Sequence, residues 1–365
     1  MVASAAASST LLPAGAPPSN VSAPRELFVF ATFTNDPSAF GEGLHVLASL
    51  DGLNWHTLAK DPILLAAGKV GTLFRDPSIM WHHGWFHLVF TTDLCAGIPK
   101  QSWECNDAAR RDSTPARFGY ARSRNLLDWQ GVRTVTVPLH GACNVWAPEW
   151  YEPSSAESKD LGGARAIVVF SATVKSAAAA CPVNWRRTKG NPHRPYYMGT
   201  ADFDAWSSPS LLFDAGESAI DTVLHRPPAD SPLAGSLFAV YKAESNECAD
   251  ELQWPPRGMR APWRAGGAMV ANRPFTNASS CRDVLRLARA TSVLGPFEPA
   301  PLGLTPWWSN ALSRACVEGP TVLPRKNDYL VIYDGYRVGC PHASPPPCKG
   351  ALPRLPRTSA CRHTP

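Results

Sequence analysis

The stretch Phe118-Gly-Tyr-Ala-Arg-Ser-Arg-Asn-Leu-Leu-Asp-Trp129 joins a strand pattern of small residues to a polar turn and a closing aromatic residue. The same order returns at three other places in the chain, at Leu44–Trp55, Tyr197–Trp206 and Leu285–Phe297. Strongly apolar strand patterns fill the intervals, as in residues 76–81 and 84–92. Long helical periodicity is nearly absent, so the repeated unit consists of strands.

Two apolar strands followed by two amphipathic strands describe a four-stranded antiparallel blade. A lone blade cannot cover both of its faces, so such blades stack around an axis and bury one another. Counting a partial copy from Arg25 to Lys60, the sequence predicts an all-β fold, a five-bladed β-propeller over residues 25–337. A β-sandwich with accidentally similar hairpins is the weaker alternative, because the signature occurs four times.

The two ends of the chain differ from the repeats. Residues 1–24 are rich in Ala, Ser and Pro, and we expect a disordered N-terminal lead. Residues 338–365 are basic and rich in Pro and Cys, and we expect an irregular tail there. This tail replaces the second half of the fifth blade, so the last blade is expected to be incomplete.

Composition narrows the class of protein. The chain has 36 Pro in 365 residues, twice the usual share of about 5%, which favours short strands joined by loops. A net charge of +5 is too dilute to indicate a nucleic-acid partner. No apolar run reaches the roughly 18 residues that a membrane span needs. We expect a monomer.

Cysteine use points to the secretory pathway or the extracellular space. The ten Cys residues are an even number, and several lie in long inserts at 95–115, 175–195 and 244–280, so disulfides are expected. No CxxC pair exists, which argues against zinc. Sequons at Asn20 and Asn277 agree with glycosylation, whereas residues 1–24 make an unconvincing signal peptide.

Acidic residues recur near the start of the predicted inner strand of four blades. In a propeller this strand lines the central channel, so its first side chains point into a shared pocket. The four residues are Asp76, Glu149, Asp221 and Glu318. Turn chemistry explains any one of them, but it does not require an acid each time. A ring of carboxyl groups suits glycoside hydrolysis, which needs a protonated acid and an ionised base.

The motifs around these acids resemble those of family 43 glycoside hydrolases, five-bladed arabinanases, arabinofuranosidases and β-xylosidases. The resemblance covers residues 26 to about 337. It rests on the order of Phe74–Ile79, Trp146-Ala-Pro-Glu149, Ala219-Ile-Asp221 and Val317–Thr321. It implies an inverting hydrolase of arabinose- or xylose-containing polysaccharide or oligosaccharide.

The resemblance also implies roles for single residues. Asp76 matches the general base, Asp221 the acid that tunes and orients the proton donor, and Glu318 the general acid. Glu149 stands where the family usually has Asp, and is expected to contact the substrate or support the site. Thr222 follows Asp221 where the family often has Pro. Family members sometimes hold a structural calcium ion, but no ligands for it can be named here, and we expect neither a metal site nor another cofactor.

Three further residues are candidates for substrate binding. Arg75 adjoins the proposed base, where a charge-assisted hydrogen bond would hold the carboxylate ionised; a solvated surface Arg is the alternative. Lys242 follows an apolar strand and either reaches the pocket or, as we favour, ends in water. Trp146 is suited to stack on a sugar, or else belongs to the core.

Two other functions stay open. Fructan-cleaving propellers carry Asn-Asp-Pro, Arg-Asp-Pro and Glu-Cys motifs, and this chain has them at Asn35–Pro37, Arg75–Pro77 and Glu247–Cys248. The first and last of these follow their strands instead of preceding them, which favours coincidence. A propeller that binds glycans or a protein without catalysis is the alternative from another class.

Overall fold

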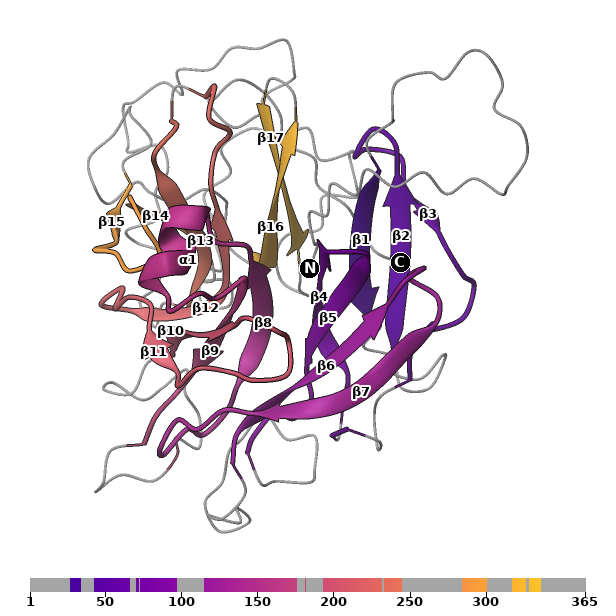
Figure 1. Ribbon diagram of the computed structural model, residues 1–365, viewed down its shortest axis with the longest axis horizontal. Coiled ribbons are helices and arrows are strands. Elements are labelled where there is room, and N and C mark those ends of the chain that lie inside the picture. Colours follow the sequence, from indigo (N-terminus) through magenta and orange to yellow (C-terminus); the bar gives the residue numbers. More distant parts are fainter. Residues whose placement is uncertain are drawn as a thin grey trace, which may run out of the picture.

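The computed structural model describes residues 27–33, 43–65, 70–71, 73–96, 115–175, 181, 193–231, 233–244, 284–300, 317–325 and 328–335. Its strands form five antiparallel sheets arranged as a β-propeller (Figure 1). Within these ranges the only helix is α1 (Ser155–Asp160). The predicted all-β propeller is therefore confirmed, while the predicted lead and tail lie outside the described residues.

Three of the sheets have four strands, and in each the strands follow one another in chain order. One sheet contains β4 (Arg75–His82), β5 (Trp85–Thr91), β6 (Arg117–Ser123) and β7 (Trp129–Thr136). The next contains β8 (Trp146–Tyr151), β9 (Ala166–Ala172), β10 (Arg194–Thr200) and β11 (Ser210–Leu211). The third contains β12 (Ser218–His225), β13 (Leu237–Glu244), β14 (Val284–Ala290) and β15 (Glu298–Pro299).

The first and last sheets are smaller in the described part of the chain. They contain β1 (Phe28–Phe33), β2 (Leu44–Ser49) and β3 (His56–Thr57), and β16 (Val317–Arg325) with β17 (Asp328–Gly335). These two sheets contact each other, because Leu323 and Ile332 pack with Phe28, Phe30 and Trp55. The first and last sheets thus pack on each other and close the ring of the described fold.

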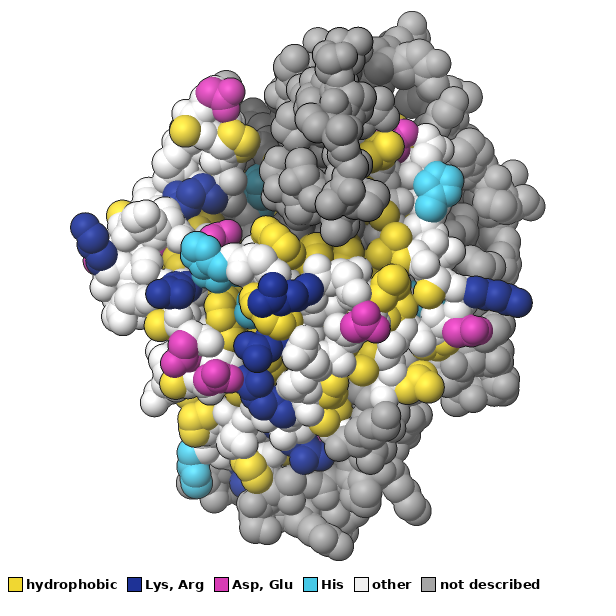
Figure 2. All heavy atoms as spheres, turned by 45° about the vertical axis from the view of Figure 1, so that its right-hand side comes forward, with side chains coloured by type: hydrophobic (Ala, Val, Ile, Leu, Met, Phe, Trp, Pro, Cys, Tyr) yellow, Lys and Arg dark blue, Asp and Glu magenta, His cyan; other side chains and the backbone are white. Residues whose placement is uncertain are grey.

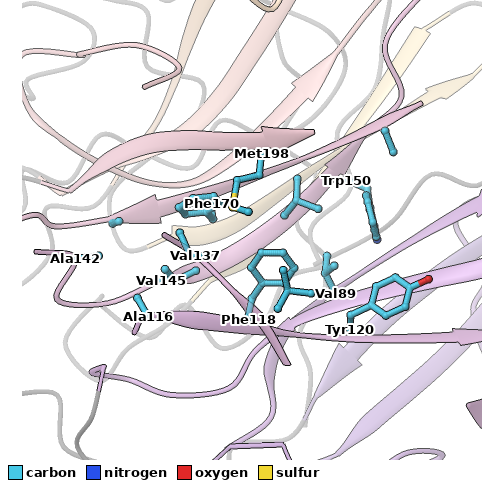
Figure 3. Close-up of a cluster of buried hydrophobic side chains, with 14 of the residues drawn as sticks. Val89, Ala116, Phe118, Tyr120, Val137, Ala142, Val145, Trp150, Phe170 and Met198 are labelled. Atoms are coloured by element: carbon cyan, nitrogen blue, oxygen red, sulfur yellow. The ribbon is translucent and has the colours of Figure 1, made fainter. Parts of the chain in front are cut away.

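The first strands of successive sheets lie side by side around the axis: β1 on β4, β4 on β8, β8 on β12 and β12 on β16. Apolar side chains fill the space between neighbouring sheets. Figure 3 shows the cluster between the sheets β4–β7 and β8–β11, which includes Phe118, Tyr120, Phe170 and Met198. Each sheet therefore buries on its neighbour the face that it could not cover alone.

The repeated polar turn has a single hydrogen-bond pattern. Side-chain Oδ1 atoms of Asp51, Asn125 and Asp202 accept hydrogen bonds from the backbone N–H groups two and three residues further on. Asp and Asn suit this turn because their short side chains reach the following backbone. The sequence signature that predicted the blades is thus a turn closed by side-chain hydrogen bonds. It follows the second strand of the first sheet (β2) and the third strand of the next two sheets (β6 and β10).

Disulfide formation is confirmed for part of the chain. Cys143 and Cys181 are joined across 38 residues, and Cys95 is disulfide-bonded as well. Disulfides agree with an oxidising compartment. In the described part of the chain no helix has the length and apolarity needed to cross a bilayer. On the face drawn in Figure 2, basic and acidic side chains both lie among hydrophobic ones.

The small residues of the repeat are explained by close contacts. Gly119 lies opposite Phe90 in the neighbouring strand, and a Cβ atom added to it would lie 2.2 Å from the Phe90 ring. The replacement Gly119→Ala should lower the free energy of unfolding by about 1–3 kcal/mol through overpacking. Thermal unfolding measures this loss. The additional replacement Phe90→Leu should recover part of it; an unchanged melting temperature for Gly119→Ala would contradict the packing described.

Candidate active site

Four inner strands carry the same irregularity near their first residues. The pairing register of β4, β8, β12 and β16 with the next strand shifts between Arg75 and Ser78, Trp146 and Glu149, Ile220 and Val223, and Glu318 and Thr321. Within each shift one residue has a positive φ: Asp76 (48°), Ala147 (47°), Asp221 (53°) and Gly319 (58°). Such bulges bend a strand and turn its side chains in a new direction.

The bulges correct one sequence-based inference. Asp76 and Asp221 occupy the same left-handed position of their strands, but Glu318 precedes that position by one residue and Glu149 follows it by two. The four acids therefore do not occupy equivalent positions in their strands, although their recurrence in the repeat had suggested that they would. Counting from the strand start missed this, because a bulge changes the direction of side chains without changing the motif order.

The four carboxyl groups nevertheless share one site. Asp221 Oδ2 accepts the backbone N–H of Gly319 at 3.0 Å, beside Glu318. The charge of Glu318 raises the pKa of both Asp76 and Asp221, and these two aspartates raise the pKa of Glu149. Residues from four different sheets thus act on one another electrostatically near the axis.

Asp76 is held by a threonine that the sequence did not single out. The hydroxyl of Thr91, at the end of β5, donates to Asp76 Oδ2 at 2.8 Å and accepts the backbone N–H of Ala147 at 2.9 Å. One side chain therefore joins the bulges of β4 and β8. A threonine at a strand end carries no sequence signal for this role, because the role depends on the neighbouring sheet.

Desolvation dominates the charge state of the site. Glu149 is 3% exposed and Asp221 8% exposed, and burial raises the pKa of Glu149 to about 8 and that of Asp221 to about 7. Part of Asp76 is exposed, yet enclosure of its carboxyl group raises its pKa too, although the charge of Arg75 opposes this. At neutral pH the site therefore retains protons that free carboxyl groups would lose.

The residues predicted to bind substrate lie in or beside this site. Lys242 is 2% exposed, and its Nζ lies 3.0 Å from Glu318 Oε2, so the favoured interpretation of a lysine ending in water is wrong. Trp146 is 7% exposed and donates from Nε1 to the carbonyl of Leu94 at 2.7 Å. Arg75 lies over the Phe33 ring at 5.1 Å and acts on Asp76.

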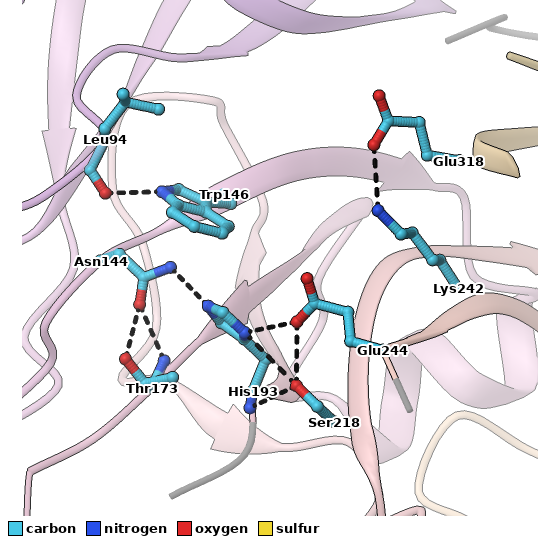
Figure 4. A network of polar contacts seen from close by, with 9 residues as sticks. All are labelled: Leu94, Asn144, Trp146, Thr173, His193, Ser218, Lys242, Glu244 and Glu318. Carbon is cyan, nitrogen blue, oxygen red and sulfur yellow. Dashed lines mark hydrogen bonds and ion pairs between the residues drawn. The ribbon is translucent and has the colours of Figure 1, made fainter. Parts of the chain in front are cut away.

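A second polar cluster adjoins the site and was missed by sequence reasoning. It consists of His193, Glu244, Ser218, Asn144 and Thr173 (Figure 4). His193 belongs to the insert 175–195, which the sequence marked only by its cysteine. Glu244 lies two residues after Lys242 on β13. Side chains two residues apart on a strand point to the same face of the sheet, so the position of Lys242 could have indicated Glu244.

Two sequence-based expectations concern residues outside the site described above. Among the described residues there is no group of three or more His, Cys, Asp or Glu side chains that could hold a metal ion. The motifs Asn35–Pro37 and Glu247–Cys248 and the sequons Asn20 and Asn277 lie outside the described ranges.

The sequence and the structure were compared with known proteins. Residues 24–271, more than half of the chain, match a family model described as a probable glycosyl hydrolase domain, related to family 43. No curated protein matches the sequence. The fold is similar to an endo-arabinase from Bacteroides thetaiotaomicron, with a TM-score of 0.51 and 13% identity over 84% of each chain.

Two further solved structures are more distant. A thermostable family 43 glycoside hydrolase has a TM-score of 0.46 and 12% identity over 81% of this chain and 75% of its own. A β-fructofuranosidase from Bombyx mori has a TM-score of 0.37 and 16% identity over 60% of this chain and 40% of its own.

The chain therefore belongs to the family of probable glycosyl hydrolase domains related to family 43. It is a glycoside hydrolase by family, and its substrate is a carbohydrate. The β-propeller is the fold that this chain shares with the endo-arabinase. The family model ends at residue 271 and does not include Glu318. The place of Glu318 in the site therefore rests on the structure and on the sequence motif around it.

Glu149 gives a pH-dependent prediction for stability. Its pKa is raised from 4.5 to about 8 in the fold, so its contribution to stability is present below about pH 4.5 and is lost as the pH rises through 8. The slope is at most about 1.4 kcal/mol per pH unit for one group. Glu149→Gln, which stays neutral, should flatten the fall of melting temperature between pH 5 and 8. The exposed neighbour Glu152 (Glu152→Gln) is the control, and an equal slope in wild type and Glu149→Gln would disprove the burial argument.

Proposed function

We propose that this protein hydrolyses glycosidic bonds of arabinose- or xylose-containing polysaccharides or oligosaccharides with inversion of configuration. The observation that carries the proposal is the gathering of acids from three sheets: Asp221 Oδ2 accepts the backbone N–H of Gly319, beside Glu318, and the charge of Glu318 acts on Asp76. Inverting hydrolysis requires two carboxyl groups on opposite sides of the scissile bond and in opposite charge states. A buried group of acids supplies both states near neutral pH.

In this mechanism Asp76 is the general base. Its carboxylate takes a proton from a water molecule as the water oxygen attacks the anomeric carbon. Thr91 orients this carboxylate through Oδ2, and the charge of Arg75 favours its ionised form. Because desolvation raises the pKa of Asp76, the base becomes active as the pH rises.

Glu318 is the general acid, and it donates its proton to the leaving-group oxygen as the glycosidic bond breaks. Its side chain is 35% exposed, which leaves access for a substrate oxygen. Asp221 is fixed by the backbone N–H next to Glu318 and acts on it electrostatically, as expected of a residue that tunes and orients the donor. Glu149 is buried beside them, and the charges of both aspartates act on its carboxyl group, so we assign it a supporting role in the site.

The substrate class and the location complete the proposal. The order of the motifs and the endo-arabinase fold support a pentose-containing polysaccharide. The Cys143–Cys181 disulfide supports secretion, because disulfides persist in oxidising compartments. We propose a monomer whose closed ring buries each sheet on its neighbours, with no nucleic-acid or membrane partner.

Removal of either reacting group should abolish most of the activity. Glu318→Gln and Asp76→Asn should each reduce kcat by about 10²–10⁴-fold, the usual contribution of acid or base catalysis. For Glu318→Gln the loss should be smaller with an aryl glycoside whose leaving group needs no proton. Purified variants would be assayed on aryl arabinofuranosides and xylosides, with aryl fructosides as the comparison. Full activity of both variants, or activity on fructosides alone, would contradict the assignment.

The stereochemical course is a separate prediction. The first product released should have the anomeric configuration opposite to that of the substrate, because water replaces the leaving group in one displacement. Proton NMR during the first minutes of hydrolysis distinguishes the two anomers before they interconvert. A product of retained configuration would require a covalent intermediate and would rule out the role given to Asp76.

A further inference from the structure

The bulges of the inner strands place backbone N–H groups outside the ladders of their own sheets. Ala147 on β8 and Gly319 on β16 both lie within a register shift, so the ladder does not pair them. A side chain of the preceding sheet accepts each N–H: the Thr91 hydroxyl accepts that of Ala147 at 2.9 Å, and Asp221 Oδ2 accepts that of Gly319 at 3.0 Å. Buried N–H groups need such acceptors. Of the two, only the hydroxyl always has a proton of its own to donate.

The contacts of the Thr91 hydroxyl fix the direction of its proton. A backbone N–H can only donate, so the oxygen of Thr91 is the acceptor in its contact with Ala147. The proton of Thr91 is therefore directed to the other close oxygen, Asp76 Oδ2, 2.8 Å away, a distance typical of an O–H···O hydrogen bond. A carboxyl proton on Oδ2 would collide with this donated proton. Thr91 thus keeps Oδ2 unprotonated.

Thr91 is held firmly enough to act as a fixed donor. Its backbone pairs with Arg75 on β4 and with Phe118 on β6, so the residue lies between two strands of its sheet. Thr91 is 1% exposed, and a β-branched side chain in a strand has few χ1 rotamers. Water therefore does not compete for the hydroxyl, and the donor keeps its direction.

The other oxygen of Asp76 remains for the reaction. Among the residues that the structure describes, Oδ2 accepts the hydrogen bond from Thr91, and Oδ1 accepts none. The charged or titratable groups that act on this carboxyl group, or on which it acts, are Arg75 on the same strand, Glu149 on β8, Asp221 on β12 and Glu318 on β16. Oδ1 is therefore the oxygen of Asp76 that can receive a hydrogen bond from a water molecule.

We propose that Thr91 is a positioning residue that selects Oδ1 of Asp76 as the atom that takes the proton from water. This inference rests on the proposed function, in which Asp76 is the general base. As the water oxygen bonds to the anomeric carbon, one water O–H bond breaks and its proton passes to Oδ1. The glycosidic bond breaks in the same step, and its oxygen takes the proton of Glu318. Through the N–H of Ala147, the same hydroxyl ties the base to the sheet β8–β11.

A purely structural role for Thr91 would use only the lone pairs of its hydroxyl. They satisfy the N–H of Ala147, whatever the charge of Asp76. The donated hydrogen bond is different, because it stabilises the carboxylate more than the carboxylic acid. Desolvation raises the pKa of Asp76, and the hydrogen bond from Thr91 lowers it in part. The structural role and the positioning role therefore differ in how they depend on pH.

The replacement Thr91→Val tests this, because it keeps the branched shape and removes the hydroxyl. The acid limb of the kcat/KM–pH profile should move up by about one unit, since a hydrogen bond to a charged group changes a pKa by about that much. With an aryl pentoside, kcat should fall by about tenfold while KM changes less, because Oδ1 is no longer aimed at the water. Thr91→Ser, which keeps the hydroxyl, should bring the limb back. A folded, active Thr91→Val variant with an unmoved acid limb overturns the proposal.

A second buried threonine supplies the matched control. The hydroxyl of Thr200, at the end of β10, accepts the backbone N–H of Phe203 at 2.8 Å, and Thr200 is 2% exposed. Thr200→Val should therefore lower the melting temperature, as the loss of a buried acceptor does, without moving the acid limb. An equal shift of the limb for Thr200→Val would assign the effect to packing and refute the positioning role. If Thr91→Val does not fold, Thr91→Ala, with its smaller side chain, should move the limb in the same direction.

A readout without substrate separates this proposal from the proposed function. Absence of hydrolysis by the wild-type protein on every pentoside would refute the function, and melting temperatures of wild type and Thr91→Val from about pH 4 to about pH 9 would then decide the role of Thr91. The hydrogen bond favours the ionised carboxyl group, so the loss caused by Thr91→Val should widen as the pH rises through the pKa of Asp76. In an Asp76→Asn background the loss should stay constant. A constant loss with Asp76 present would show that Thr91 is not a donor to the carboxylate.

Discussion

Asp76, Ala147, Asp221 and Gly319 hold a left-handed backbone at the start of four inner strands, and the site depends on this shared distortion. Only Gly319 adopts the conformation freely; the others are strained by about 1–3 kcal/mol each. Packing of each inner strand on its neighbours, together with the Thr91 bridge between two bulges, holds the distortion in place. The rigid ring therefore supports the strain, and the strain turns the acids toward one another.

Burying acids at the axis has an electrostatic consequence for the whole site. Asp221 and Glu149 gain protons because water is excluded from them, whereas Glu244 stays ionised because donors and a cation surround it. Buried carboxyl groups on the strands β8, β12 and β13 thus differ widely in charge. Burial raises the pKa of Asp221 and Glu149, whereas nearby positive charge and hydrogen bonds lower the pKa of Glu244 against its burial. A hydrolase needs both kinds of carboxyl group in one place.

Much of the fold followed from local chemistry. The capped turns at Asp51, Asn125 and Asp202 and the glycine beneath Phe90 leave direct traces in the sequence, because they act within one sheet. The predicted alternation of apolar and amphipathic strands was therefore confirmed. The site was predicted less completely. Thr91 and His193 act across sheets, and no spacing in the chain records which residues of two sheets will meet.

The amino-acid sequence by itself determined the repeating blade and the acids that open its inner strands, because strand periodicity and turn capping are short-range effects. Tertiary structure alone decided that Glu149 and Glu318 occupy different bulge positions. It also decided that Lys242 is buried against Glu318 and that His193 and Ser218 support Glu244. The physical reason is that desolvation and charge coupling depend on distances between sheets, and these exist only after the ring has closed.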